Sequence, residues 1–253
     1  MKRAGKILLC SAAAAFIFIG YAREAVMAQD KEIQLPQPKT TGTVSLEQAI
    51  AQRRSIRSFA SKDLNQEQIS QLLWAGQGQT SGYKRAAPSA GSLYPMEVYL
   101  LTKDGLFHYA SEGHKLHVLG TDDLRGALAA ASGQSILKDA AADIIIGGVS
   151  ARIVPRYGER GMRYLYIEAG HIAENIHLQA VSLGLVSLPV GSFNDSEVQK
   201  ALGMPSECRP VYIVAVGYAG SPEEPFSTME STTMQGTTGG RGTTKKSTAA
   251  TSY

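Results

Sequence analysis

The sequence predicts an α+β protein in which helices are layered against a sheet. Two strand-like runs, 96–101 and 106–109, are joined by a short turn, as in a β-hairpin. Apolar residues also recur at helical spacing over 161–183, the longest such stretch in the chain. A mixture of hairpin strands and long helices favours an α+β layer fold over a doubly wound parallel sheet.

Composition limits the possible classes of protein. The chain has 253 residues, of which 43% are hydrophobic, so it can form one domain with appendages. The 25 Lys and Arg residues nearly balance the 22 Asp and Glu residues, which argues against a nucleic-acid binder. Cys10 and Cys208 are too few for a disulfide scaffold or a four-cysteine zinc site, and the five histidines show no metal-ligand spacing. We therefore predict neither nucleic acid nor a metal as a partner.

The first segment has the pattern of an export signal. Lys2, Arg3 and Lys6 precede an apolar run over 7–21, and small or apolar residues at 26–28 suit a cleavage site. We predict a signal peptide over 1–28 and an exported, periplasmic or extracytoplasmic protein that meets the membrane only through this signal. An uncleaved N-terminal membrane anchor is the alternative, although the run is shorter than a spanning helix needs.

Residues 29–44 are predicted to be a linker, because Pro, Gln, Thr and Gly dominate its second half and can bury little surface. The main domain, 45–220, begins at Ser45-Leu46-Glu47-Gln48. This spacing fits a capping box, and Leu46, Ala49 and Ile50 follow on one helical face.

The remaining elements follow from capping residues and apolar runs. Asn65 opens a second helix that carries Ile69, Leu72 and Leu73 inward. The hairpin turns at Lys103-Asp104-Gly105, where Gly tolerates positive φ. The other predicted elements are a strand over 116–119, a helix from Thr121 as cap to Ala131, a strand over 142–149 buried on both faces, the helix over 161–183, a strand over 185–190, a helix from Asn194 to Leu202 and a strand over 211–216. After Gly220 the composition shifts to Ser, Thr, Gly and Pro, so 221–253 is predicted to be a disordered tail.

Arg53, Arg54, Ser55 and Arg57 form the densest group of chemically informative residues. Three guanidiniums and a hydroxyl within five residues suit a phosphate, because Arg offers forked donors that match phosphate oxygens. The alternative is a solvated basic helix end that interacts favourably with the helix dipole.

The order of motifs along 45–220 resembles the nitroreductase superfamily. Arg-Arg-Ser-x-Arg-x-Phe over 53–59 is similar to its opening motif, and Leu188-Pro189-Val190-Gly191-Ser192-Phe193 to its flavin-facing strand and loop. The runs 87–95 and 156–164, with Glu168-Ala169-Gly170-His171, resemble the subgroup of the SagB-type azoline dehydrogenases. This resemblance implies a mainly antiparallel central sheet flanked by helices, with the long helix at a dimer interface.

The resemblance also implies a site for FMN. Arg53, Arg54, Ser55 and Arg57 would hold its phosphate, ribityl and pyrimidine parts, and Val190 and Gly191 would aim a backbone N–H at flavin N5. The residues implied to contact the flavin from other segments are Pro88, Ser89, Ala90, Gly91, Ser92 and Leu93 of the partner subunit, and Leu188 and Pro189. Tyr94 would be a proton donor or substrate-facing ring, or it would serve packing.

One stretch departs from the superfamily's pattern. Basic residues often follow the last strand there and complete the phosphate site, whereas this chain has Ser221-Pro222-Glu223-Glu224-Pro225. Either Arg160 or Arg163 replaces them, or FMN binding is weaker than usual; we favour Arg163 as the replacement.

The implied function is that of an FMN-dependent oxidoreductase, a homodimer that transfers hydride or electrons by a ping-pong mechanism. NAD(P)H is a candidate donor, and the acceptor would be a small molecule or a peptide. Two alternatives stay open at this point. One is a flavin-consuming enzyme of the same fold, and the other is a noncatalytic flavin- or peptide-binding protein.

Overall fold

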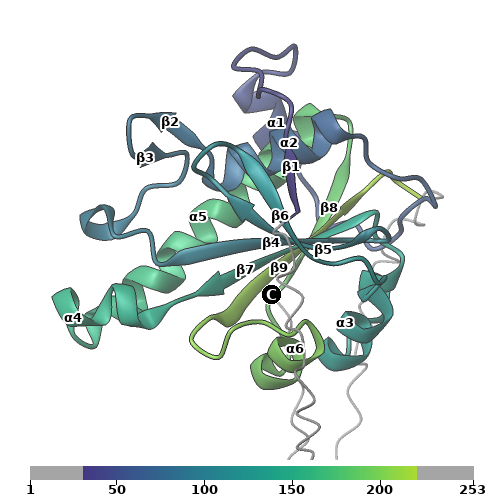
Figure 1. Ribbon diagram of the computed structural model, residues 1–253. Coiled ribbons are helices and arrows are strands. Elements are labelled where there is room, and N and C mark those ends of the chain that lie inside the picture. Colours follow the sequence, from purple (N-terminus) through teal and green to yellow (C-terminus); the bar gives the residue numbers. More distant parts are fainter. Residues whose placement is uncertain (1–30, 221–253) are drawn as a thin grey trace, which may run out of the picture.

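The computed structural model describes residues 31–220, which form a seven-stranded sheet with helices on both faces (Figure 1). Every neighbouring pair of strands in this sheet is antiparallel, so the predicted α+β fold with a mainly antiparallel sheet is confirmed. The predicted signal peptide, 1–28, and the predicted tail, 221–253, lie outside the described residues. Over 31–220, no helix combines the length and apolar character needed to span a membrane.

The sheet has the strand order β1-β6-β5-β4-β7-β9-β8. Its strands are β1 (Glu32–Gln34), β4 (Met96–Thr102), β5 (Gly105–Ala110), β6 (Lys115–Gly120), β7 (Ala142–Gly148), β8 (Val186–Val190) and β9 (Arg209–Gly217). A separate two-stranded hairpin, β2 (Gln79–Ser81) and β3 (Lys84–Arg85), was not predicted. The predicted hairpin is confirmed as β4 and β5, and its turn residue Gly105 has a φ of +134°.

Six α-helices and three short 3-10 helices connect the strands of the described part. The α-helices are α1 (Leu46–Gln52), α2 (Gln66–Gln77), α3 (Arg125–Ser132), α4 (Val154–Tyr157), α5 (Arg160–Ser182) and α6 (Asp195–Ala201), and the 3-10 helices are η1 (Ala90–Ser92), η2 (Ser135–Lys138) and η3 (Ser150–Arg152). The predicted long helix is confirmed as α5, which has 23 residues and is about 34 Å long.

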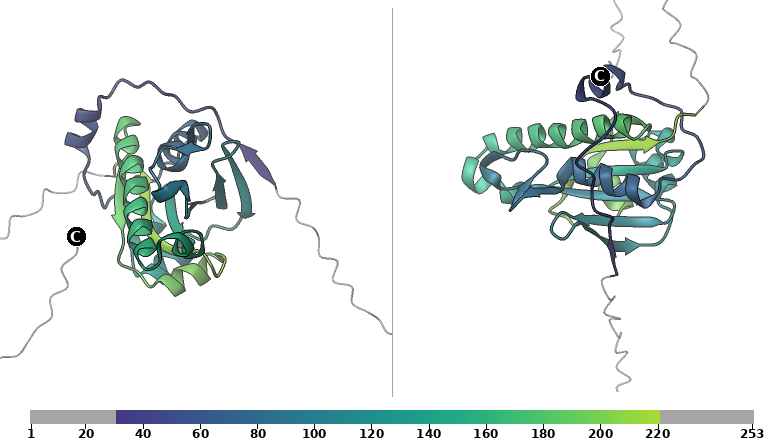
Figure 2. Two further views of the ribbon diagram at one scale, coloured as in Figure 1. Left: turned by 90° about the vertical axis from the view of Figure 1, so that its left-hand side faces the viewer. Right: turned by 90° about the horizontal axis from the view of Figure 1, so that it is seen from above.

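The alternation of side chains along the central strands separates two apolar cores. On β7, Ile144 and Ile146 pack with α2 and α5, whereas Ile145 points to the opposite face and packs with α3 and α6. Figure 2 shows α5 lying along one face of the sheet. All seven residues of β7 are buried, which confirms the prediction of a strand covered on both faces.

Capping residues begin α1 and α2 where the sequence predicts. Ser45 Oγ accepts the N–H of Gln48 at 3.1 Å, and the Gln48 side chain accepts the N–H of Ser45 at 3.0 Å. Asn65 and Gln68 form the same reciprocal pair. The predicted apolar face of α1 is only partly buried in the core. Ala49 is buried, whereas Leu46 and Ile50 are exposed.

Part of the predicted linker is built into the core. Residues 32–34 form β1, which pairs with β6, and Leu35 is only 3% exposed. The Ser70 hydroxyl donates to the Pro36 carbonyl at 2.6 Å. The expectation that this segment buries little surface is therefore wrong. Main-chain pairing and one apolar residue anchor it despite its polar composition.

Thr121 does not cap the helix that follows β6. That helix, α3, begins at Arg125, and its N-cap Leu124 provides no side-chain bond. Asp123 instead accepts the N–H of Arg125 at 3.1 Å and also binds its guanidinium. The prediction was wrong because Asp123 lies closer to the first turn and offers a charged acceptor.

Candidate active site

The arginine-rich segment after α1 lies beside the edge strand β8. Ser55 forms a parallel bridge with Ser187, and the N–H of Ile56 donates to the Ser187 carbonyl at 3.1 Å. Two groups of predicted site residues, 53–57 and 188–191, are thereby brought to the same edge of the sheet. In the sequence the two groups are more than 130 residues apart.

The three guanidiniums of this segment differ in their contacts. Arg53 Nε lies 4.0 Å from a Glu174 oxygen, while Arg54 donates to the carbonyls of Ala51 and Arg53 at 2.9 and 2.7 Å. Arg57 is exposed and makes no hydrogen bond or ion pair within residues 31–220. Forked donors that face solvent beside a sheet edge are suited to an anion such as a phosphate.

His177 belongs to this site but was not predicted as a site residue. It is 3% exposed, and its Nδ1 lies 2.7 Å from the Ser187 hydroxyl. Burial, and then the positive charge of Arg53, lowers the pKa of His177 to about 4, so the ring is neutral near pH 7. The sequence did contain a signal for the burial of His177. The residue lies at helical spacing between the apolar residues Ala173 and Ala180, so it belongs to the apolar face of the predicted helix.

The predicted flavin-contacting loop, Pro88 to Leu93, has unusual backbone conformations. Gly91 and Ser92 have φ values of +61° and +55°, and Tyr94 has +46°. A Cβ on Gly91 would lie 2.7 Å from the Tyr157 hydroxyl oxygen, so a side chain there would force Tyr157 to shift and would be strained at this positive φ. Non-glycine residues in this region are strained and need support from their surroundings.

Tyr94 is held by several contacts at the end of this loop. Its N–H donates to Ser89 Oγ at 2.9 Å, and its hydroxyl oxygen accepts the N–H of Arg85 at 3.2 Å. The Arg85 guanidinium lies 4.6 Å from the ring centroid, and Arg152 donates to the Tyr94 carbonyl at 3.3 Å. These contacts give the ring a packing role, and its proposed role in proton transfer stays a prediction.

The loop and the arginine segment lie beside different parts of α5 in one protomer. Ser89 lies beside Glu168, whereas Arg53 lies beside Glu174 and influences His177. Glu168 and His177 are nine residues apart, which is about 13 Å along the helix axis. No hydrogen bond or ion pair among the described residues joins the two groups.

Arg160 and Arg163 are exposed near the beginning of α5. Arg163 precedes Glu174 by eleven residues, or about 16 Å of helix, so it is not brought to Arg53 within the protomer. Arg163 could therefore complete the predicted phosphate site only from a second protomer.

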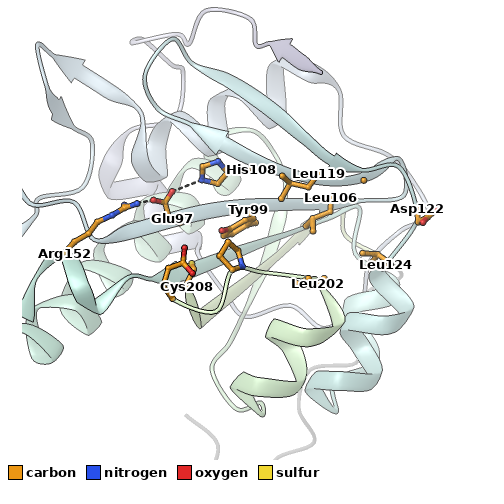
Figure 3. Close-up of a pocket in the computed structure, with 14 residues that line it drawn as sticks. Glu97, Tyr99, Leu106, His108, Leu119, Asp122, Leu124, Arg152, Leu202 and Cys208 are labelled. Carbon is orange, nitrogen blue, oxygen red and sulfur yellow. Dashed lines mark hydrogen bonds and ion pairs between the residues drawn. The ribbon is translucent and has the colours of Figure 1, made fainter. Parts of the chain in front are cut away.

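A cavity of about 630 Å³ lies elsewhere, where β4, β5 and β6 meet the α6–β9 connection (Figure 3). At one end, Glu97 lies 2.6 Å from His108 Nε2 and pairs with Arg152. Burial opposes ionisation of Glu97, but the His108 hydrogen bond and the Arg152 charge outweigh it and lower the carboxyl pKa. Burial raises the pKa of Cys208, in the wall, to about 11. None of the predicted flavin contacts lines this cavity.

Comparison with known proteins identifies clear relatives. Residues 50–218 match the model of the nitroreductase family. A nitroreductase-like protein of Methanocaldococcus jannaschii is 34% identical over 200 residues, which cover 76% of this chain and 98% of the relative. The crystal structure of a nitroreductase-like protein from Ralstonia eutropha has a TM-score of 0.69 at 27% identity and covers 78% of this chain and 94% of that one.

The microcin synthetase McbBCD complex of E. coli has a chain of the same fold. That chain aligns with a TM-score of 0.59 at 22% identity, over 76% of this chain and 79% of its own length. At this identity the similarity concerns the fold alone.

Proposed function

The chain belongs to the nitroreductase family, and from this premise we propose that it is an FMN-dependent oxidoreductase. It would transfer hydride or electrons between a donor and a small-molecule or peptide acceptor. The observation that carries the proposal is the bridge between Ser55 and Ser187, which places the arginine segment beside β8 and Gly191. A group of donors suited to a phosphate would thus lie next to a small-residue edge suited to a flat ring.

The residues at this edge suit FMN chemically. Arg53 and Arg57 would bind the phosphate through charge-assisted hydrogen bonds, and the exposed Gly191 leaves room for a ring to approach the backbone. FMN, when bound, supplies hydride and electron transfer, in two half-reactions with a donor and an acceptor. The protein's part is to bind, orient and shield the reacting groups. Neutral His177 keeps the Ser187 edge in place without adding charge.

A homodimer is part of this proposal. Apolar side chains remain exposed on α1 and α5, which contact each other: Leu46 and Ile50 are 62% and 56% exposed, and Tyr166 and Ile167 are 50% and 48% exposed. A second copy covering these helices would remove that apolar area from water. It would also bring the Pro88 to Leu93 loop and Arg163 of one protomer to the arginine segment of the other.

The substrate is proposed at the level of a class. The SagB-type resemblance favours a dehydrogenase acting on a small molecule or a peptide, with NAD(P)H as a candidate donor in the reducing direction. Export through residues 1–28 would limit access to cytosolic NAD(P)H, and cell fractionation with an antibody against the domain tests that location.

The absorbance spectrum of the purified protein tests the central proposal. A bound flavin band that bleaches with NAD(P)H or dithionite, and returns with a quinone or nitroaromatic acceptor, is the expected result. Protein that binds no FMN when titrated with it would overturn the proposal. Flavin that no donor reduces would instead favour a noncatalytic binding protein, and fragmentation of the flavin in air would favour a flavin-consuming enzyme.

A further inference from the structure

Glu168 is a carboxyl group buried in the middle of α5. It is 1% exposed, and its Oε1 accepts a long hydrogen bond of 3.4 Å from Gln77 Nε2 on α2. Within residues 31–220 its Oε2 has no partner in hydrogen-bonding geometry. A buried carboxyl oxygen that accepts no hydrogen bond lowers the stability of the fold, so we expect a donor near this atom.

Ser89 supplies the complementary group. Its Oγ already accepts the N–H of Tyr94 at 2.9 Å, and a hydroxyl that accepts one bond can still donate its own hydrogen. That hydrogen has no other acceptor among the described residues. The Ser89 hydroxyl also lies close enough to Glu168 to lower the pKa of its carboxyl group as a donor.

We propose that Glu168 is a positioning residue, which accepts the Ser89 hydroxyl on Oε2 and so holds the loop from Pro88 to Tyr94 in its strained conformation. A chain of hydrogen bonds would then run from Gln77 through Glu168 and Ser89 to the Tyr94 amide. It would tie the loop to α2 and α5 together. The consequence for flavin binding rests on the function proposed above, whereas the contact itself does not.

The tie would act on a loop whose backbone is strained, although Ser92 and Leu93 donate local N–H bonds to Ser89 and Ala90. Gly91, Ser92 and Tyr94 all have positive φ, and two of them carry side chains. Gly91 and Ser92 are exposed, whereas Ala90 and Leu93 of the same loop pack partly against the core. A bond from below, through the half-buried Ser89, would add to that packing and leave the outer surface free for a ligand.

The protonation state of Glu168 changes the strength of this tie. Burial raises its pKa to about 7, opposed by Ser89, Gln77 and the charge of Arg85. Arg85, from β3, is the charged group that acts on it, while α2 contributes the neutral Gln77. Above pH 7 both carboxylate oxygens accept hydrogen bonds. Below pH 7 one oxygen carries a proton, and the Ser89 bond is weakened.

Hydrogen exchange of the Tyr94 amide in flavin-free protein tests the contact directly. Glu168→Met removes the acceptor at similar length. Ser89→Ala removes the donor to Glu168 and also the Oγ that accepts the Tyr94 N–H. Glu168→Met should speed exchange in a peptide covering 88–95 by about tenfold, as expected for one lost hydrogen bond, and Ser89→Ala should speed it by at least as much. The double variant should be no faster than Ser89→Ala alone, because Ser89→Ala already lacks the contact that Glu168→Met removes.

Two further variants sharpen the test. Glu168→Gln keeps an acceptor oxygen but cannot ionise, so it should retain slow exchange and lose the dependence on pH near 7, after correction for intrinsic rates. Asp143→Asn is the matched control, because Asp143 is a fully buried carboxyl with two unpartnered oxygens on β7, far from the loop. It should leave the loop unchanged.

Unchanged exchange in Glu168→Met, or multiplying effects in the double variant, would overturn the proposal. If Glu168→Met does not fold, Ser89→Ala measured across pH 6 to 8 still decides it, because that variant should lose the pH dependence of loop exchange. FMN titration is a separate measurement. Both single variants should bind FMN about tenfold more weakly. Wild-type protein that binds no FMN would refute the proposed function and leave the exchange result standing.

Discussion

His177 Nδ1 and the Ser187 hydroxyl lie 2.7 Å apart, and this contact joins the C-terminal part of α5 to the edge strand β8. Ser187 also receives the N–H of Ile56 on its backbone carbonyl. One buried serine therefore connects the long helix, the sheet edge and the arginine segment. The geometry of the proposed phosphate site depends on this connection more than on the arginines' own contacts.

Replacing Arg53 and Arg57 together with Ala should strip FMN from the protein and leave its fold intact. Charge-assisted hydrogen bonds contribute about 1.5 to 3 kcal/mol each, so affinity should fall at least a hundredfold. Flavin content per protein and circular dichroism measure the two effects. Arg209→Ala is the control, since this exposed arginine pairs with Asp195 away from the segment. Full flavin occupancy in the double variant would refute the assignment.

The buried His177 should make the protein less stable in acid. Its pKa is lowered from 6.5 to about 4, so the unfolded chain takes up a proton first and stability falls as the pH drops from 6.5 towards 4. The loss is at most about 3 kcal/mol. Urea unfolding of wild type and His177→Gln at pH 7.5 and 4.5 measures it. The difference in unfolding free energy between wild type and His177→Gln should be smaller at pH 4.5 than at pH 7.5. An equal difference at both pH values would show that His177 does not titrate in this window.

The buried Glu168 should make the stability of the protein depend on pH in the opposite direction. Its pKa is raised from 4.5 to about 7, so the stability present below pH 4.5 is lost as the pH rises through 7. Glu168→Gln should therefore gain stability relative to wild type on going from pH 4.5 to pH 8, by up to about 3 kcal/mol. Thermal unfolding at both values checks this. An equal stability difference between Glu168→Gln and wild type at the two pH values would show that the Glu168 carboxyl does not titrate with a raised pKa.

A charge on the exposed face of α5 should dissociate the proposed dimer. Ile167→Glu places a carboxylate where an apolar contact with a second copy is expected, and buried unpaired charge opposes association. Light scattering should give the monomer mass, with weaker FMN binding. Leu119→Glu is a matched control, because Leu119 is 53% exposed on β6, away from α1 and α5. Wild-type protein that is monomeric and carries stoichiometric FMN would exclude a shared site.

Gly91→Ala should disturb the loop although it adds one methyl group. The residue has a φ of +61°, and the new Cβ would approach the Tyr157 hydroxyl to 2.7 Å. We expect a loss of about 1 to 3 kcal/mol in stability or an equivalent loss in FMN affinity. Combining it with Tyr157→Phe should restore part of the loss. Gly126→Ala in α3, where the Cβ meets nothing within 4 Å, should be neutral or stabilising.

Several site features could be predicted from sequence only because they are local in the chain. The motif over 53–59 and the loop over 88–93 are short and rich in residues with specific chemistry. The environments of Glu168 and His177 could not be predicted in this way. Each belongs to a helix whose apolar pattern is visible, but its burial and its partners come from Gln77, Ser89 and Ser187 on other elements.

The sequence by itself determined where α1 and α2 begin and where the hairpin turns, whereas the start of α3 was mispredicted. The Ser45–Gln48 and Asn65–Gln68 pairs and the Gly105 turn involve residues within four positions, so their geometry is the same in almost any fold. Tertiary structure alone decided that Ile33 pairs with Leu116, that Ser55 lies beside Ser187, and that Asp143 is buried without partners. The first two features join residues separated by many tens of positions, and the burial of Asp143 depends on elements packed around β7. These features arise only because two apolar cores close on opposite faces of one sheet, which no local pattern encodes.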